Sequence, residues 1–202
     1  MAYDGGAANE TIADVLSRPQ ISLMDEVSAE MVRSFLDQLA EAEADGGDVL
    51  MELTTLGGDA ELARRIVLEI EAARRRLSGR FRFLGKTVVY SAGATIMSAF
   101  PRRDRYLAHD AVLMIHCRQL DKTIEISGPM RASLPKIESV QAQVKTGLAL
   151  EEDNFRRLIE GSDIGMDELW ERALHNWYLP ARDALARGLI AGIVGSDGRL
   201  ET

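Results

Sequence analysis

The stretch GKTVVYSAGATIMSAF, residues 85–100, constrains the fold more than any other part of the chain. It reads as a buried strand followed, after Ser91, by a short helix in which only Thr95 and Ser98 carry polar side chains. Because such a helix has no polar face, we expect it to run through the core. A hydroxyl at its first turn would lie near free backbone N–H groups at the positive end of the helix dipole, which suits a nucleophile that attacks a carbonyl. From this stretch alone, an N-cap role for Ser91 is the simpler interpretation.

A regular alternation of strands and helices surrounds this stretch. The predicted elements are strands at 49–55 and 81–89 and helices at 60–77 and 91–100. This βαβα order is typical of a parallel sheet with right-handed crossovers, in which ligands bind at the carboxyl ends of the strands. Gly57 and Gly58 follow the first strand and Ser91 follows the second. These three residues should therefore meet at one edge of the sheet.

A histidine ends the next apolar segment. RYLAHDAVLMIH, residues 105–116, reads as a hairpin of two strands with a turn near His109 and Asp110, and it finishes on His116. A histidine in this setting is often structural. Its neutral imidazole is also able to take a proton from a hydroxyl during nucleophilic attack, so both roles stay open at this point.

Length and composition favour a single domain over residues 1–202, because 46% hydrophobic content supports one core and no Pro/Gly/Ser-rich linker divides the chain. The formal net charge of −8 argues against a nucleic-acid partner, since an acidic surface repels phosphate.

The single cysteine, Cys117, excludes an internal disulfide, and no Cys/His cluster has metal-ligand spacing, so no cofactor is expected. The sequence has no signal-peptide pattern and no apolar run of about 20 residues, which predicts a cytoplasmic protein outside the membrane.

Three short motifs together resemble the proteolytic subunit of the Clp protease family. They are TLGG at 55–58, VYSAGA at 89–94 and MIHC at 114–117. The family's pattern has a strand then SPGG, a strand then AASMGA, and a strand ending MIHQP. The separation of 25 positions between Ser91 and His116 (116 minus 91) is the one seen in that family. LPARDALARGLI at 179–190 also resembles the family's closing FLSAxEAxxYGLID, so the resemblance covers about residues 20–192.

This resemblance implies an α/β fold, the ClpP/crotonase-like spiral of βαβ units with a protruding helical handle at 120–160. It implies a serine-type endopeptidase that hydrolyses unfolded proteins or peptides inside a homo-oligomeric chamber of heptameric rings, stacked as a tetradecamer. By the same resemblance, Ser91 is the nucleophile and His116 the general base. The backbone N–H groups of Gly58 and Ala92 would form the oxyanion hole. An AAA+ ATPase partner is left open, because ADVLSR at 13–18 matches the family's N-terminal segment only faintly.

The segments outside the motifs carry further expectations. Residues 1–18 are expected to be largely flexible. A helix is predicted from a Ser133 N-cap to near Gly161, with Gly147 as a position where it could break. Its apolar positions Ile137, Val140, Val144 and Leu148 form a stripe that continues to Phe155 and Leu158. In the family the handle helix follows a strand, which also adds beside the bound peptide, and LDKTIEISG at 120–128 would supply that strand.

Departures from the family's pattern keep other functions open. Leu56 stands where the family has a proline before the glycines, and Cys117 and Arg118 follow the histidine. One alternative is a catalytically impaired or noncatalytic subunit of the same fold. A second is a crotonase-type acyl-CoA enzyme, which shares the fold and the backbone oxyanion donors. A third is a serine–lysine dyad with Lys86 or Lys122 as the base.

The third member of the catalytic triad is the largest departure. An ungapped count back from the shared Gly188 puts Arg172 where the family has its catalytic aspartate. An arginine cannot accept the histidine Nδ1–H, because its guanidinium only donates and carries a positive charge. Two neighbours are candidate replacements: Glu171 as a carboxylate, and Asn176 as a neutral acceptor that would orient the ring without stabilising its charge.

Overall fold

The computed structural model describes residues 12–202, and the part of the predicted flexible segment that covers residues 1–11 lies outside the described chain. The described elements are, in chain order, α1 (Ile12–Val15), β1 (Ile21–Met24), α2 (Ala29–Asp45), β2 (Val49–Thr55), α3 (Ala60–Arg76), β3 (Phe81–Tyr90), α4 (Ala92–Met97), a 3-10 turn (Arg102–Asp104), β4 (Arg105–Ala108), β5 (Val112–Ile115), α5 (Met130–Ile159), α6 (Met166–Ala173), β6 (Trp177–Pro180), α7 (Ala181–Ala186), β7 (Gly192–Val194) and β8 (Leu200–Glu201).

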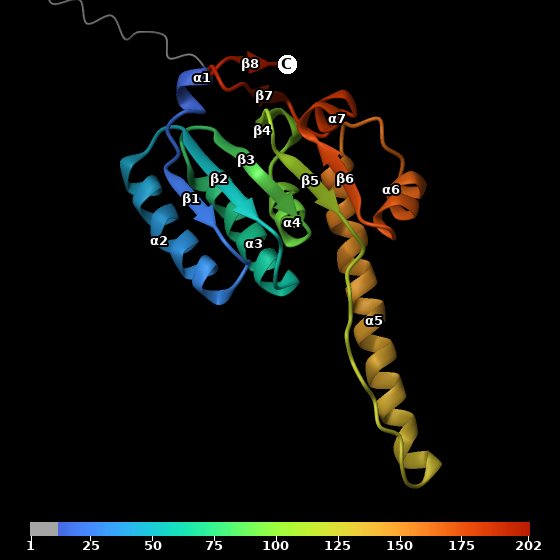
Figure 1. Ribbon diagram of the computed structural model, residues 1–202. Coiled ribbons are helices and arrows are strands. Elements are labelled where there is room, and N and C mark those ends of the chain that lie inside the picture. The colour runs from blue at the N-terminus through green and yellow to red at the C-terminus, as the bar shows by residue number, and fades with distance from the viewer. Residues whose placement is uncertain (1–11) are drawn as a thin grey trace, which may run out of the picture.

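A mostly parallel sheet forms the body of the molecule (Figure 1). Within residues 12–202 the strands follow the spatial order β1, β2, β3, β4, β7, β8, and only the β7–β8 pair in this series is antiparallel. β5 pairs in parallel with β3, and β6 pairs antiparallel with β5. Helices α2, α3 and α4 each connect successive parallel strands. The predicted α/β architecture is therefore confirmed.

Residues 105–116 do not form the hairpin that the sequence predicted. β4 and β5 both run parallel to β3 along the same edge, where they pair with its residues 83–85 and 88–90 in turn. Between these two stretches β3 bends at Thr87, whose φ is 57°. The turn at His109 and Asp110 joins two successive segments of one edge rather than reversing the chain. Two antiparallel strands of a hairpin and two successive strands along one sheet edge have the same apolar pattern in sequence. The pattern therefore could not distinguish the two structures.

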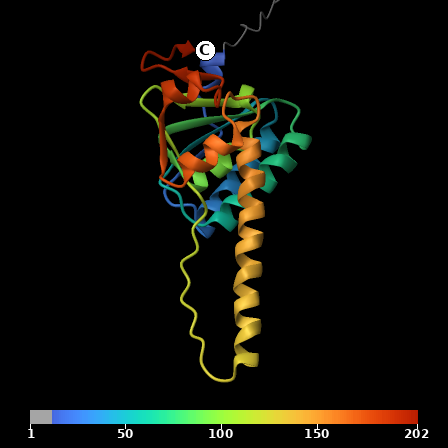
Figure 2. The same ribbon diagram turned by 90° about the vertical axis from the view of Figure 1, so that its right-hand side faces the viewer.

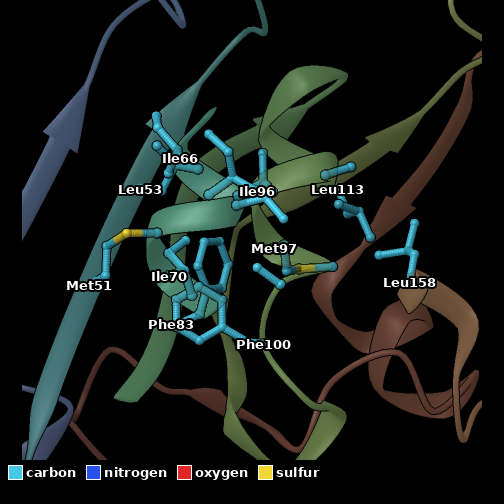
Figure 3. Close-up of a cluster of buried hydrophobic side chains, with 14 of the residues drawn as sticks. Met51, Leu53, Ile66, Ile70, Phe83, Ile96, Met97, Phe100, Leu113 and Leu158 are labelled. Carbon is cyan, nitrogen blue, oxygen red and sulfur yellow. The ribbon is translucent and has the colours of Figure 1, made fainter. Parts of the chain in front are cut away.

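The two faces of the sheet bury different sets of side chains. Met51 and Leu53 of β2 belong to the larger core, which α3 and α4 complete (Figure 3). Ile96 of α4 is fully buried there, as expected for a helix without a polar face. Leu50 points to the opposite face and packs with Leu16 and with side chains of β3 and β4. Residues 12–18, included in the predicted flexible segment, are thus anchored to the sheet by Leu16.

Helix α5 projects far beyond the sheet (Figures 1 and 2). It spans 30 residues, begins at Met130 before the predicted Ser133 N-cap, and continues through Gly147 without a break. Apart from Ser133, its buried residues are Glu151, Asn154, Phe155 and Leu158, all near the C-terminal end. The distal part of the helix is exposed, including Ile137. No helix within residues 12–202 is long and apolar enough to cross a bilayer.

The segment before α5 is extended but unpaired. Residues 117–128 run beside α5 in both views (Figures 1 and 2), and no strand forms there within the described chain. The strand predicted at 120–128 is therefore wrong for the single chain. A strand needs a neighbouring edge to receive its backbone hydrogen bonds, and β5 already ends at Ile115. Alternate side chains of the segment, Leu120, Ile124 and Ile126, remain exposed.

A buried arginine connects α5 to the segment that follows α4. Arg105 is 1% exposed and forms no ion pair with another residue of the described chain. Its guanidinium donates instead to the main-chain carbonyls of Ser98, Phe100, Arg157, Leu158 and Leu189. Burial lowers the pKa of Arg105 to about 10, so the group remains protonated at neutral pH. Because helix ends leave carbonyls unpaired, Arg105 holds the end of α5 against the end of α4.

We expect Arg105→Leu to lower the free energy of unfolding by at least about 3 kcal/mol, because several buried carbonyls would lose their donor. Arg103→Leu, at an exposed side chain two positions earlier, is the control and should stay within about 0.5 kcal/mol of wild type. Chemical denaturation followed by circular dichroism measures both. Equal stability of the two variants would contradict this role for Arg105.

Candidate active site

Ser91 occupies a strained turn between β3 and α4. Its backbone has φ 55° and ψ −111°, a conformation that costs a residue with a side chain about 1–3 kcal/mol. The Ser91 N–H donates to the Met114 carbonyl at 2.9 Å, which holds the turn against β5. The hydroxyl makes no capping hydrogen bond to α4. The simpler N-cap interpretation of Ser91 is therefore not supported.

His116 lies immediately after β5 and beside Ser91. Tyr90 and Met114 are partners in the parallel β3–β5 register, so the residues that follow the two strand ends are neighbours. His116 Nε2 is 2.5 Å from Ser91 Oγ. Burial lowers the pKa of His116 below its ordinary 6.5, and the backbone of Cys117 opposes this effect only in part. The ring is therefore neutral at neutral pH, which is the form a general base needs.

Two glycines bring backbone N–H groups close to Ser91. Gly57 and Gly58 have φ values of 117° and 142°, which L side chains rarely adopt. A Cβ at Gly57 would lie 2.9 Å from the Ser91 Cβ, and one at Gly58 would lie 2.6 Å from the Val27 carbonyl oxygen. Within the described chain, the N–H groups of Gly58 and Ala92 donate to no other group. Such free donors beside a nucleophile are able to stabilise a developing oxyanion.

A cavity of about 290 Å³ brings these groups together. Its wall includes Gly58, Ser91, Ala92 and His116, the four residues predicted for catalysis and for the oxyanion hole. The remaining lining residues are Ala60, Thr95, Arg118, Gln119, Glu151, Asn154 and Phe155. Residues 12–202 contain no group of three or more His, Cys, Asp or Glu side chains able to hold a metal ion. The arrangement suits acyl transfer from a bound carbonyl to a serine hydroxyl.

Comparison with known proteins agrees with this geometry. The family model described as Clp protease matches residues 4–197. The chain belongs to the Clp protease family. Among solved structures, a point mutant of ClpP1 from Listeria monocytogenes matches with a TM-score of 0.67 and 18% sequence identity, over 88% of this chain and 92% of the Listeria chain. At that identity the likeness shows the ClpP fold alone, and the comparison with curated proteins gave no match.

The third member of a Clp protease triad is not in contact with His116. The Nδ1 atom of His116 is buried, and no side chain accepts a hydrogen bond from it. The predicted acceptors, Glu171 and Asn176, are both exposed, and neither is hydrogen-bonded to the imidazole. Arg172 pairs with Glu168 at 2.9 Å and its guanidinium lies over a tryptophan ring. The structure brings Ser91 and His116 together but leaves the far side of the imidazole unsupported.

His116 directly follows β5 and Asn176 directly precedes β6, at the same end of this antiparallel strand pair. β5 and β6 pair antiparallel with Ile115 opposite Trp177. The pairing ends there, and the next main-chain bond joins the Cys117 N–H to the Ala173 carbonyl. Asn176 has φ 58°, so the chain turns out of the sheet there. Of the two candidate acceptors, Asn176 is therefore the one that adjoins the β5–β6 pair, at the end where His116 lies.

The other candidate nucleophiles and bases lie away from this pair. Burial and the nearby Glu151 carboxylate raise the pKa of the Cys117 thiol, which disfavours the reactive thiolate. Lys86 pairs with Glu52, and Lys122 donates to Gln143 of α5. Neither lysine lines the cavity that contains Ser91. The geometry gives the serine–lysine dyad no support.

Two lining residues were missed by the sequence analysis. Glu151 and Asn154 lie four positions before Phe155 and Leu158 on α5, so they share the buried face of the helix. The sequence signal that could have identified them is a carboxylate and an amide, each four positions before a buried apolar residue of the same helix. The cavity that they face depends on where α5 docks, and Arg105 holds that end of the helix in place.

The strain at Ser91 predicts an unusual order of stability. Ser91→Gly should be more stable to unfolding than Ser91→Ala by about 1 kcal/mol or more, because glycine adopts this backbone conformation at little cost. Ser98 in the same segment has φ −62°, so Ser98→Gly should be less stable than Ser98→Ala. Thermal denaturation of the four variants tests the contrast. The same order at both positions would show that Ser91 is not strained.

Proposed function

We propose that this chain is a Clp-type serine endopeptidase that hydrolyses peptides or unfolded proteins. Ser91 is the nucleophile, His116 the general base, and Gly58 and Ala92 the oxyanion donors. The observation that carries the proposal is the 2.5 Å contact between Ser91 Oγ and His116 Nε2 in a cavity that also holds two free N–H groups.

The chemistry begins when the neutral His116 ring takes the Ser91 proton as Oγ attacks the carbonyl carbon of the peptide. The carbonyl oxygen becomes negative and accepts hydrogen bonds from the Gly58 and Ala92 N–H groups. Imidazolium then returns the proton to the leaving amine, and an acyl-enzyme forms on Ser91. Water attacks this ester by the same route and releases the peptide acid.

Fluorophosphonate labelling is the direct test of this function. A fluorophosphonate should add one label to the wild-type chain, and intact-mass measurement should find none on Ser91→Ala. Ser98→Ala, which removes a buried hydroxyl near the end of α4, is the control and should label as wild type does. Equal labelling of wild type and Ser91→Ala would remove Ser91 as the nucleophile.

A catalytically impaired subunit is the second candidate, and the unpartnered His116 Nδ1 favours it. Without an acceptor, the ring is not held in one tautomer, and the imidazolium formed during attack gains no charge stabilisation. Asn176, which directly precedes β6 just as His116 directly follows β5, offers a neutral carbonyl once its side chain turns toward the ring. The proposal is therefore a weak peptidase whose third member is an asparagine.

Asn176→Asp should raise kcat/KM for a fluorogenic peptide by about tenfold or more, because a carboxylate stabilises imidazolium. It should also change the pH profile. Wild type should lose activity on the acid side with an apparent pKa below 6.5, since burial disfavours protonated His116. The carboxylate favours that protonated form, so the acid limb of Asn176→Asp should move to higher pH.

Arg172→Asp is the matched control for this prediction. It places a carboxylate at the position given by the ungapped count, so it should neither raise the rate nor shift the acid limb. If Arg172→Asp activates and Asn176→Asp does not, the assignment of Asn176 is wrong and the count was right.

Assembly is the remaining part of the proposal. We propose that the chain forms a homo-oligomeric chamber of stacked heptameric rings through residues 120–160. The exposed apolar residues of this region are Leu120, Ile124, Ile126, Met130, Leu134, Ile137, Val144 and Leu148. An apolar surface of this extent is rare on a monomer and supports burial against other copies. An AAA+ ATPase partner and a cytoplasmic location stay predictions from the sequence.

Ile137→Asp should reduce the assembly to smaller species, because it puts a charge in the apolar surface. Ser139→Asp adds the same charge two positions away, on nearly the opposite side of α5, and should leave the assembly intact. Light scattering at micromolar concentration measures both. A wild-type chain that remains monomeric would remove the chamber from the proposal.

A further inference from the structure

Glu151 is a buried carboxylate in the wall of the cavity that contains Ser91. It lies one turn before Phe155 on α5, and both residues line that cavity. The residue is only 4% exposed. Its Oε2 accepts the backbone N–H of Arg118, whereas its Oε1 is buried without a hydrogen-bond partner. Burying a carboxylate oxygen without a hydrogen bond costs free energy. This oxygen is therefore free to accept a hydrogen bond from a donor that is not part of the chain.

The nearest cationic side chain is already engaged. The guanidinium of Arg118 pairs with Glu61, which also holds Arg64 at 2.6 Å. Only the main-chain N–H of Arg118 donates to Glu151. Burial raises the pKa of Glu151, although the Arg118 charge and this hydrogen bond act against the shift. A positive group that entered the cavity would add the missing donor and favour the charged carboxylate.

We propose that Glu151 makes the enzyme select lysine or arginine at the residue whose carbonyl Ser91 attacks. This inference rests on the proposed peptidase function, because it takes Ser91 as the nucleophile. The side chain of that residue branches from the carbon next to the attacked carbonyl, so the cavity shared by Ser91, His116 and Glu151 is the space beside it. The net charge of −8 also favours the approach of basic peptides.

The substitution Glu151→Gln removes the negative charge but keeps the hydrogen bond from the Arg118 N–H. The glutamine amide keeps one carbonyl oxygen to accept the Arg118 N–H, and it replaces the unpaired oxygen by an NH₂ group that repels a cation. Glu152→Gln is the matched control. It removes the same charge from the next position of α5, where Glu152 pairs with Arg156 and does not line the cavity.

The kinetic experiment compares coumarin amide peptides that carry lysine or its uncharged analogue norleucine before the scissile bond. Wild type and Glu152→Gln should both hydrolyse the lysine peptide with a kcat/KM at least about tenfold higher. For Glu151→Gln the ratio should fall to near one. A ratio that survives in Glu151→Gln, or a wild type that prefers norleucine, would overturn the proposal.

A binding experiment tests the same inference without hydrolysis. Fluorescence anisotropy on the full-length Ser91→Ala protein should give a Kd for the lysine peptide at least about tenfold lower than for the norleucine peptide, and Ser91→Ala/Glu151→Gln should lose the difference. Equal Kd values in Ser91→Ala refute the role of Glu151, whereas fluorophosphonate labelling of Ser91 still supports the peptidase. Selective binding by a protein that neither labels nor hydrolyses would refute the peptidase and retain the cation site.

Discussion

The parallel pairing of β5 with the second half of β3 is the constraint on which the site depends. It places the Met114 carbonyl where it accepts the Ser91 N–H, and this bond helps to hold the strained turn. The same register sets His116 two residues beyond Met114, within reach of the Ser91 hydroxyl. The bend at Thr87 is what lets β4 and β5 share one edge of β3 in succession. A straight, uninterrupted pairing would shift His116 along the edge and separate the pair.

The buried Arg105 of the scaffold and the buried groups of the site differ in their hydrogen bonding. Arg105 is surrounded by carbonyls that satisfy its guanidinium, so its burial adds rigidity between α4 and α5. In the site, His116 Nδ1 and Glu151 Oε1 are buried without partners, and the Gly58 N–H is free. Native structures rarely leave such groups unsatisfied unless a ligand or a reaction uses them. Buried side-chain atoms without partners also occur away from the cavity, at Glu52, Arg82 and Arg157, so the signature of the site is that its unpaired groups lie beside a serine–histidine pair.

The sequence predicts the positions of the strands and helices better than it predicts which strands pair with one another. β2 matches the predicted strand at 49–55, and the Ser91 and His116 segments were identified, because periodicity and turn residues are local signals. The hairpin at 105–116 and the strand at 120–128 were wrong, because pairing depends on which edge is available in space. Which residue supports His116 likewise depends on position in space. The count along the chain pointed to Arg172 and left Glu171 and Asn176 as candidates, whereas the β5–β6 pair shows that Asn176 directly precedes the strand beside β5.

Helix α5 links the surface proposed for assembly to the site proposed for catalysis. Its distal part exposes Ile137, whereas its last turns carry Glu151 and Phe155 into the wall of the cavity. The extended segment beside it starts directly after His116, and Glu151 holds that segment through the Arg118 N–H. A neighbouring strand edge that paired with residues 120–128 would therefore act on the chain only a few residues from His116. No side chain supports the far side of the imidazole, so the orientation of the His116 ring is the part of the site most sensitive to a displacement of this segment. Assembly through residues 120–128 would produce such a displacement.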